Sequence, residues 1–250
     1  MLGFAAIVTS VDSTLSQWPS EFCVQPPGQQ AVAGLNELIA SRVRYWSDRN
    51  GGELPRSIVI YRDNIPLHSY ECVAQEEMSR IRQGCNAVYP NSLKSRGLPQ
   101  VTMVLLDQQD HTYFNPTVDA DPDGTGFPTA GMVVDRGVTD PRVWDFYLLS
   151  HCPLTGGNQP TRYLVAWDEV FRCGATGGTT AASLLQELTY NLCYLVGERT
   201  MAMNVCAPAY YAWVVLSRVF SYPDNSRSLD IAGRHPVRIH PSLQNTMFYI

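Results

Sequence analysis

Lysine is almost absent from this sequence, since Lys94 is the single lysine among 18 Lys and Arg residues. Asp and Glu together number 23, so the formal net charge is −5. Nucleic-acid-binding domains are usually basic, because neutralising phosphates supplies much of their affinity. Charge alone therefore argues against an RNA-binding domain. The sequence also lacks any apolar run of about 18 residues, which argues against a transmembrane helix.

The seven cysteines show no CxxC spacing, and their number is odd. Both features argue against a disulfide framework and against a zinc site. The pattern instead predicts reduced, mostly buried thiols, which are typical of a cytoplasmic protein. The opening residues MLGFAAIVTSVD lack the basic region and the cleavage site of a signal peptide. They predict a buried strand that begins at once, and we expect the chain to be truncated at its N-terminus.

Hydrophobic residues make up 45% of the 250 positions, enough for the core of one large domain. Apolar runs alternate with segments of helical period, which predicts an α/β domain with a partly parallel sheet. The expected strands are Leu2–Thr9, Glu21–Gln25, Ser57–Arg62, Val101–Leu106, Met132–Val134, Trp144–Leu149 and Tyr163–Trp167. The expected helices are Gln29–Trp46, Tyr70–Cys85, Thr180–Val196 and Pro208–Phe220. The continuous apolar character of Leu2–Thr9 and Ser57–Arg62 predicts strands covered on both faces.

Asp63 directly follows the apolar strand Ser57–Arg62. In open α/β sheets, ligands bind outside the carboxyl ends of the strands, and a carboxylate there could hold a divalent metal. Aspartate also favours turns, so Asp63 could instead cap the chain reversal at residues 64–66. A two-metal phosphodiester site needs several converging carboxylates, and one alone does not define it.

Two further motifs have simpler interpretations. Asp119–Gly124 matches the start of an EF-hand loop, but Ala130 stands where that loop needs a bidentate glutamate. We therefore expect a solvated acidic loop. Ser150, His151 and Cys152 are consecutive, and neighbours on a strand point to opposite faces. His151 and Cys152 cannot pair there, so we expect them to fill core or surface positions.

The last expected helix carries Tyr210, Tyr211, Trp213 and Arg218. Helical spacing places Tyr211 with Arg218 on one face and Tyr210 with Trp213 on another. An arginine beside tyrosines can bind phosphate through charge-assisted hydrogen bonds. An aromatic core helix with a solvated arginine explains these residues equally well, so the pattern alone leaves both interpretations open.

Three ordered blocks carry the most specific motifs of the chain. They are IVIYRDNI at Ile58–Ile65, the block Val133–Glu169 around DFYLLSH, and ELTYNLCYL with APAYYA at Glu187–Leu195 and Ala207–Ala212. Together with the TMFYI terminus, they resemble the PIWI domain of the Argonaute/Piwi family. The resemblance implies a ribonuclease-H-like α/β fold with a mixed sheet flanked by helices. It also implies a partial PIWI domain over residues 1–250, in which the opening strand and the MID, PAZ and N domains are absent.

The resemblance further implies guide-directed RNA silencing. Slicing members of the family cut RNA with two metal ions held by an Asp-Glu-Asp tetrad that a His or Asp completes. Asp63 matches the third position, whereas Gln30 falls in the place of the glutamate and Trp213 in that of the histidine. Indole offers no metal ligand, and a neutral amide is a weak one. We therefore predict a catalytically inactive domain without a bound metal; Mg²⁺ or Mn²⁺ would serve only an active slicer.

Guide binding depends on other positions. Arg218 and Ile250 match the arginine and the terminal carboxylate that help form the family's pocket for the guide 5′ phosphate, and Tyr210 matches a tyrosine near the guide backbone. Several basic family positions are replaced here, by Gln108, Gln109, Tyr113 and Gln159. Each lost cation weakens phosphate binding. This chain alone is therefore expected to bind guide and target RNA weakly.

Three functions remain open. The first is the PIWI portion of an Argonaute-like protein that binds guide RNA for gene silencing without cutting. The second is a degenerate PIWI module that acts through protein contacts, since Argonautes bind tryptophan-containing partners on this domain. The third is a guide-directed RNA endonuclease with an unrecognised ligand set. We expect the first, in the cytoplasm.

Overall fold

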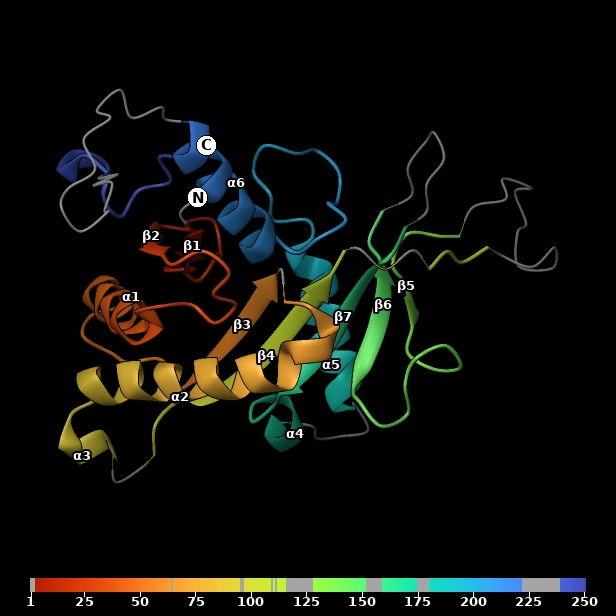
Figure 1. Cartoon of the computed structure of the whole chain (residues 1–250), viewed down its shortest axis with the longest axis horizontal. Helices are drawn as coiled ribbons and strands as arrows, with labels where there is room; N and C mark the ends of the chain where they lie inside the picture. The colour runs from red at the N-terminus through yellow and green to blue at the C-terminus, as the bar shows by residue number, and fades with distance from the viewer. Residues whose placement is uncertain are drawn as a thin grey trace. The chain divides into compact units, whose positions relative to one another are not determined.

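The computed structural model describes residues 3–63, 65–94, 97–108, 110, 112–115, 128–151, 159–174, 180–221 and 239–250. Its contacts divide the chain into two compact units, whose helices and strands are labelled in Figure 1. The first unit comprises Met1–Arg56, Gln75–Pro99 and Tyr210–Ile250, and the second comprises Ser57–Ala74 and Gln100–Ala209. Within the described ranges, no helix has both the length and the apolar character needed to cross a membrane.

The first unit contains a two-stranded antiparallel sheet, in which β1 (Gly3–Val8) pairs with β2 (Ser20–Gln25). Its helical segments are α1 (Leu35–Arg49), α2 (Tyr70–Val88) from Gln75 onward, α3 (Asn91–Lys94), α6 (Ala207–Ser221) from Tyr210 onward and η3 (Pro241–Leu243). α1 and α2 approach closely at Gly84, where a Cβ atom would lie 2.5 Å from the Asn36 carbonyl oxygen. Only glycine fits this helix crossing without a backbone shift.

The start of α1 differs from the prediction. The helix begins at Leu35 rather than at Gln29, because Gly34 has a left-handed φ of 67° that a continuing α-helix cannot contain. The preceding segment is held in a non-helical path by the side chain of Gln25. Its amide accepts from Ala33 N over 3.2 Å and donates to the Gln29 carbonyl over 3.0 Å. Local hydrogen bonding therefore overrides the helical period in this segment.

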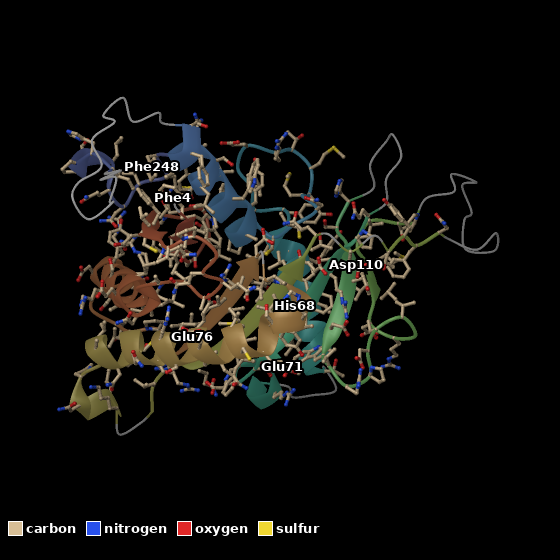
Figure 2. The ribbon with its side chains drawn as sticks, in the orientation of Figure 1. Phe4, His68, Glu71, Glu76, Asp110 and Phe248 are labelled. Carbon is tan, nitrogen blue, oxygen red and sulfur yellow. The ribbon has the colours of Figure 1, made fainter. Side chains whose placement is uncertain are left out.

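The backbone of Val32 is fixed from α2. Its N–H donates to Oε1 of Glu77 over 3.0 Å, and its carbonyl accepts from Nη1 of Arg80. Glu77 is only 1% exposed, so the hydrogen bond offsets part of the cost of burying its carboxyl group. Glu76, labelled in Figure 2, is exposed and pairs with Arg80. Two consecutive glutamates of α2 thus have different roles, one in the interior and one at the surface.

The second unit is built on a five-stranded sheet in the order β3-β4-β7-β6-β5 (Figure 1). The strands are β3 (Ser57–Asp63), β4 (Gln100–Asp107), β5 (Met132–Val134), β6 (Asp145–Leu149) and β7 (Thr161–Trp167). β3 and β4 are parallel, and the other neighbours are antiparallel, which confirms the predicted mixed sheet. The helical segments are η1 (Leu67–Ser69), the start of α2, α4 (Phe171–Gly174) and α5 (Ala181–Leu192).

Burial is greatest in the middle of this sheet. Met103 of β4, Phe146 of β6 and Tyr163 of β7 are all 0% exposed. β3 bonds to β4 alone among the described strands, and its residues from Ile58 onward are half-buried; β1 is half-buried along its whole length. The prediction that these two strands are covered on both faces was therefore wrong. An apolar run predicts a strand but does not show what packs on its two faces.

α5 starts where it was predicted and ends earlier. Thr180 caps its N-terminus through a capping box with Ser183. The predicted end at Val196 was wrong because the last turn tightens. Cys193 N donates to the carbonyl of Tyr190, three residues back, over 3.0 Å.

Candidate nucleic-acid interface

The carboxyl ends of β3 and β4 bring Asp63 and Gln108 together. The two strands are parallel, with Asp63 opposite Leu106, so the residues that follow them emerge at the same sheet edge. Nε2 of Gln108 donates to Oδ2 of Asp63 over 3.2 Å. The backbone carbonyl of Asp63 accepts from Nη1 of Arg62. The carboxylate predicted as a catalytic remnant therefore lies in a hydrogen-bonded network of protein side chains.

Gln159 extends this network from the other side. Its Nε2 donates to the carbonyl oxygen of Asp110 over 2.8 Å and to that of Gln108 over 3.4 Å. Gln108 and Gln159 are thus neighbours, although 51 positions separate them in the chain. Both occupy positions where the family resemblance implies a cation. Here they donate neutral amide hydrogen bonds to groups of the second unit.

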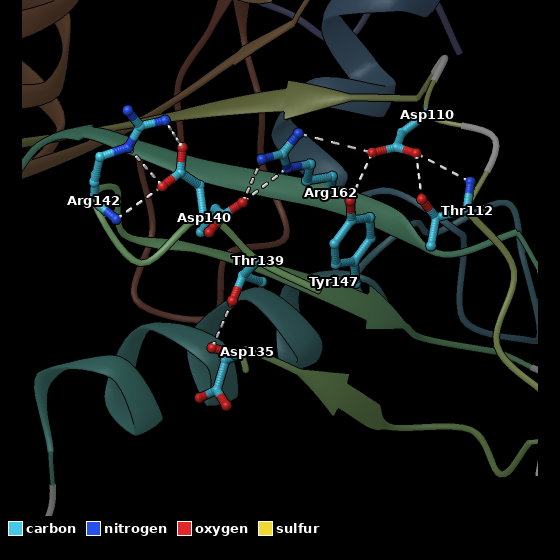
Figure 3. A network of polar contacts seen from close by, with 9 residues as sticks. Asp110, Thr112, Asp135, Thr139, Asp140, Arg142, Tyr147 and Arg162 are labelled. Carbon is cyan, nitrogen blue, oxygen red and sulfur yellow. Dashed lines mark hydrogen bonds and ion pairs between the residues drawn. The ribbon is translucent and has the colours of Figure 1, made fainter. Parts of the chain in front are cut away.

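Asp110 is the centre of a charged cluster in the second unit (Figures 2 and 3). Its Oδ1 accepts from N and Oγ1 of Thr112 over 3.0 and 2.6 Å, and its Oδ2 accepts from the Tyr147 hydroxyl over 2.7 Å. Arg162 Nη1 lies 3.8 Å from the same Oδ2. Arg162 also bonds Oδ2 of the buried Asp145 through Nη2 over 2.5 Å and Nε over 2.9 Å. The guanidinium of Arg162 is therefore shared between two carboxylates of the protein itself.

These contacts shift the pKa values of Asp110, Tyr147 and Arg162. Partial burial would raise the pKa of Asp110, but the hydrogen bonds from Thr112 and Tyr147 and the charge of Arg162 bring it below its ordinary value. Burial and the hydrogen bond to Asp110 raise the pKa of Tyr147. Burial opposes the charge of Arg162, yet its bond to Asp145 raises its pKa overall. Near neutral pH, Asp110 is therefore a carboxylate beside the Arg162 cation.

In the first unit, Arg218 holds the end of the chain. Its Nε donates to the carbonyl oxygen of Tyr249 over 3.1 Å. The Tyr249 ring is fully buried, and its hydroxyl donates to the carbonyl of Trp18. Ile250 follows with 48% of its surface exposed. The arginine and the terminal residue predicted to share a phosphate pocket thus lie close together, and their role in guide binding stays a prediction.

Tyr210 and Trp213 lie on the other side of α6. Their ring centroids are 6.2 Å apart, with an angle of 37° between the ring planes. Trp213 is 59% exposed, whereas Tyr211 on the same helix is 2% exposed and packs on Trp18 and Tyr249. The helix is therefore anchored in the core through one face and presents aromatic rings on another.

The three tetrad positions carried by this chain are distributed over both units. Gln30 is exposed in the segment before α1, in the first unit, which also contains Trp213; Asp63 belongs to the second unit. Among the described residues, no group of three or more His, Cys, Asp or Glu side chains is placed to hold a metal ion. A neutral amide and an indole supply no charged ligand, and the absence of a bound metal stays a prediction.

The weaker motifs have the following outcomes. Asp119–Gly124 and Cys152 lie outside the described residues. Ser150 Oγ donates to the Met203 carbonyl, as a structural hydroxyl does. Burial raises the pKa of the Cys85 and Cys193 thiols to about 11, so both are protonated at neutral pH. This agrees with the predicted buried thiols, although Cys72 is exposed.

Comparison with known proteins identifies the family. The Piwi domain family model matches residues 3–221. The protein argonaute MEL1 of Oryza sativa subsp. japonica is 31% identical over 239 residues, which cover 90% of this chain and 21% of that protein. The Schizosaccharomyces pombe argonaute is 27% identical over 223 residues, 89% of this chain and 25% of that protein. The chain therefore belongs to the Piwi domain family, and it spans about a quarter or less of the length of these relatives.

Solved structures confirm the fold. The C-terminal lobe of a budding yeast Argonaute superposes with a TM-score of 0.78 and 23% identity, covering 100% of this chain and 53% of that one. Kluyveromyces polysporus Argonaute with a guide RNA gives the same TM-score and identity over 32% of its length. The predicted PIWI fold is thus confirmed.

Proposed function

We propose that this chain is the PIWI portion of an Argonaute-like protein, which binds a small guide RNA in the cytoplasm for gene silencing and does not cleave the target. Membership of the Piwi domain family supports the guide-binding part. A structural relative has been solved with a guide RNA.

The contact between Arg218 and Tyr249 carries this proposal. A guanidinium has five N–H donors, and the carbonyl of Tyr249 takes the one at Nε. The contact orients the planar group beside the terminal residue Ile250. Charge-assisted hydrogen bonds from an oriented arginine are well suited to a phosphate group. The 5′ phosphate of a guide RNA is the ligand that this geometry favours.

The side chains at the tetrad positions of this chain do not favour cleavage. Asp63 accepts a hydrogen bond from Gln108, and the other two tetrad positions of this chain carry the neutral side chains Gln30 and Trp213. Losses within a metal-binding set are severe and not additive, so we expect no metal-assisted hydrolysis from a set in which two positions are neutral.

The test compares single-stranded RNA with a 5′ phosphate and with a 5′ hydroxyl over a range of salt concentrations. We expect the full chain to prefer the phosphorylated RNA, with binding that weakens as salt rises. Arg218→Ala should remove the preference and reduce the salt slope by about 1. Arg142→Ala is the matched control, since Arg142 is 86% exposed and pairs with Asp140. The proposal would be contradicted if the wild type did not prefer the 5′-phosphorylated RNA. It would also be contradicted if Arg218→Ala and Arg142→Ala lost RNA affinity equally.

A second candidate function is a protein-binding module derived from a PIWI domain. The amide network of Gln108 and Gln159 favours it, because these positions supply no phosphate cation. Arg162, shared by Asp110 and Asp145, adds no uncommitted charge nearby. This candidate predicts salt-insensitive binding of tryptophan-containing silencing proteins and no affinity for RNA.

A further inference from the structure

The exposed face of α6 has an unusual composition for a surface helix. From Tyr210 to Ser221, the helix contains no Asp or Glu, and Arg218 is its single charged residue. Solvent-facing sides of helices normally carry several charged residues. Here Trp213 and Phe220 are 59% and 60% exposed. This face is therefore suited to contact a ligand.

Trp213 is not part of the face of α6 that packs on the core. The inner face of α6 already buries Tyr211, Val215 and Val219, each at most 4% exposed. The indole lies outside this packed face and contacts the half-buried ring of Tyr210. Phe220, by contrast, packs edge-on against Phe4 with ring centroids 5.0 Å apart. Trp213 and Tyr210 thus form a separate pair of rings, which we call the α6 ring pair.

The charges near the α6 ring pair indicate which class of ligand can bind there. The chain as a whole is acidic, with a net charge of −5, yet this helix face carries no carboxylate. A polyanion can therefore approach it without local repulsion from the helix. Arg218 lies about one and a half turns further along α6, on the other side of the helix from the ring pair, and can contact a phosphate there. Exposed aromatic rings are the surfaces on which the bases of single-stranded nucleic acids stack.

We propose that the α6 ring pair is a stacking platform for one nucleobase of a single-stranded RNA. The proposal rests on the proposed guide-binding function and adds a contact in which Trp213 binds RNA through its π face. Stacking accepts any base, because every base has a π face. Trp213 would then contribute affinity that does not depend on salt, in contrast to Arg218, whose contribution does.

The test uses the full chain and 5′-phosphorylated single-stranded RNAs, one intact and others with a single abasic position. We expect Trp213→Leu to weaken binding of the intact RNA roughly 5- to 100-fold without changing the salt slope. Trp213→Phe keeps a ring and should retain most of the affinity. One abasic position should weaken binding to the wild type and cause little further loss in Trp213→Leu. The matched control is Trp167→Leu, which removes a tryptophan that is 38% exposed in the second unit.

The outcomes separate the two proposals. Salt-dependent RNA binding that Trp213→Leu leaves unchanged overturns the stacking platform and leaves guide binding intact. Failure of the wild type to bind any RNA overturns guide binding and the platform with it. If Trp213→Leu abolishes binding of a protein partner and not of RNA, the face is a protein-binding surface and the platform is excluded. Circular dichroism and melting temperature show whether each variant is folded.

Discussion

Gln108 donates a hydrogen bond to the carboxylate of Asp63 over 3.2 Å, at the edge where two parallel strands end. In the family, the position of Gln108 is expected to carry a cation that contacts the guide. A neutral amide binds the neighbouring carboxylate without adding charge. The neutral side chain at position 108 is therefore predicted to weaken phosphate binding, and the structure shows it as a hydrogen-bond partner of Asp63.

The first prediction restores a cation at this position. Gln108→Lys should increase RNA affinity and steepen the salt slope by up to about 1, because one more phosphate can be neutralised. The measurement is RNA affinity against salt concentration. Gln83→Lys, on the exposed side of α2, is the control with the same change in charge. Equal effects of the two substitutions would show that net charge, and not the Gln108 position, determines binding.

The second prediction concerns the buried ion pair. Arg162→Leu should lower the free energy of unfolding by about 3–5 kcal/mol, because the buried carboxylate of Asp145 loses its cation. Urea denaturation measures this. Arg142→Leu removes an exposed pair with Asp140 and should have no measurable effect. A similarly small effect of Arg162→Leu would show that the pair contributes little.

The third prediction is a dependence of stability on pH. The pKa of Asp110 is lowered in the folded protein from its ordinary value of 3.8. Its stabilising contribution is therefore fully present above that value and is lost as the pH falls through the lower folded pKa. The difference in unfolding free energy between wild type and Asp110→Asn should be constant near neutral pH and shrink under acidic conditions. A difference that stays constant down to strongly acidic pH would contradict the role given to Asp110.

The fourth prediction tests the contact between α2 and Val32. Glu77→Ala should destabilise the protein by about 1–3 kcal/mol, because the Val32 N–H loses its acceptor in a buried site. The neighbouring Glu76→Ala should cost less than about 0.5 kcal/mol, since it removes only an exposed pair with Arg80. Thermal or urea unfolding of the two variants distinguishes them. Equal losses of stability in the two variants would mean that the buried contact of Glu77 with Val32 has no specific role in stability.

Most strands could be predicted from the sequence, because apolar runs and turn residues are local signals. The start of α1 could not, since Gly34 and the side chain of Gln25 decide it together. The half-burial of β3 was also missed, because it depends on which distant segments pack on the two faces of the strand and not on the apolar run itself.

The candidate site was predictable only where motifs matched the family. Motifs located Asp63, Trp213 and Arg218, but gave no indication that Arg162 is held by Asp110 and Asp145. Those carboxylates lie 52 and 17 positions away in the chain, and only the antiparallel pairing of β6 with β7 and the loop after β4 bring them to Arg162. The bond between Gln108 and Asp63 likewise depends on the parallel pairing of β3 with β4.

The most direct test of the central claim follows binding and cleavage in one reaction. The full chain is incubated with a 5′-phosphorylated guide RNA and a matched, labelled target RNA in Mn²⁺ or Mg²⁺. We predict salt-sensitive binding of the guide and an intact target at all times. Metal-dependent cleavage of the target that Asp63→Ala abolishes would contradict the account and identify the chain as an active endonuclease.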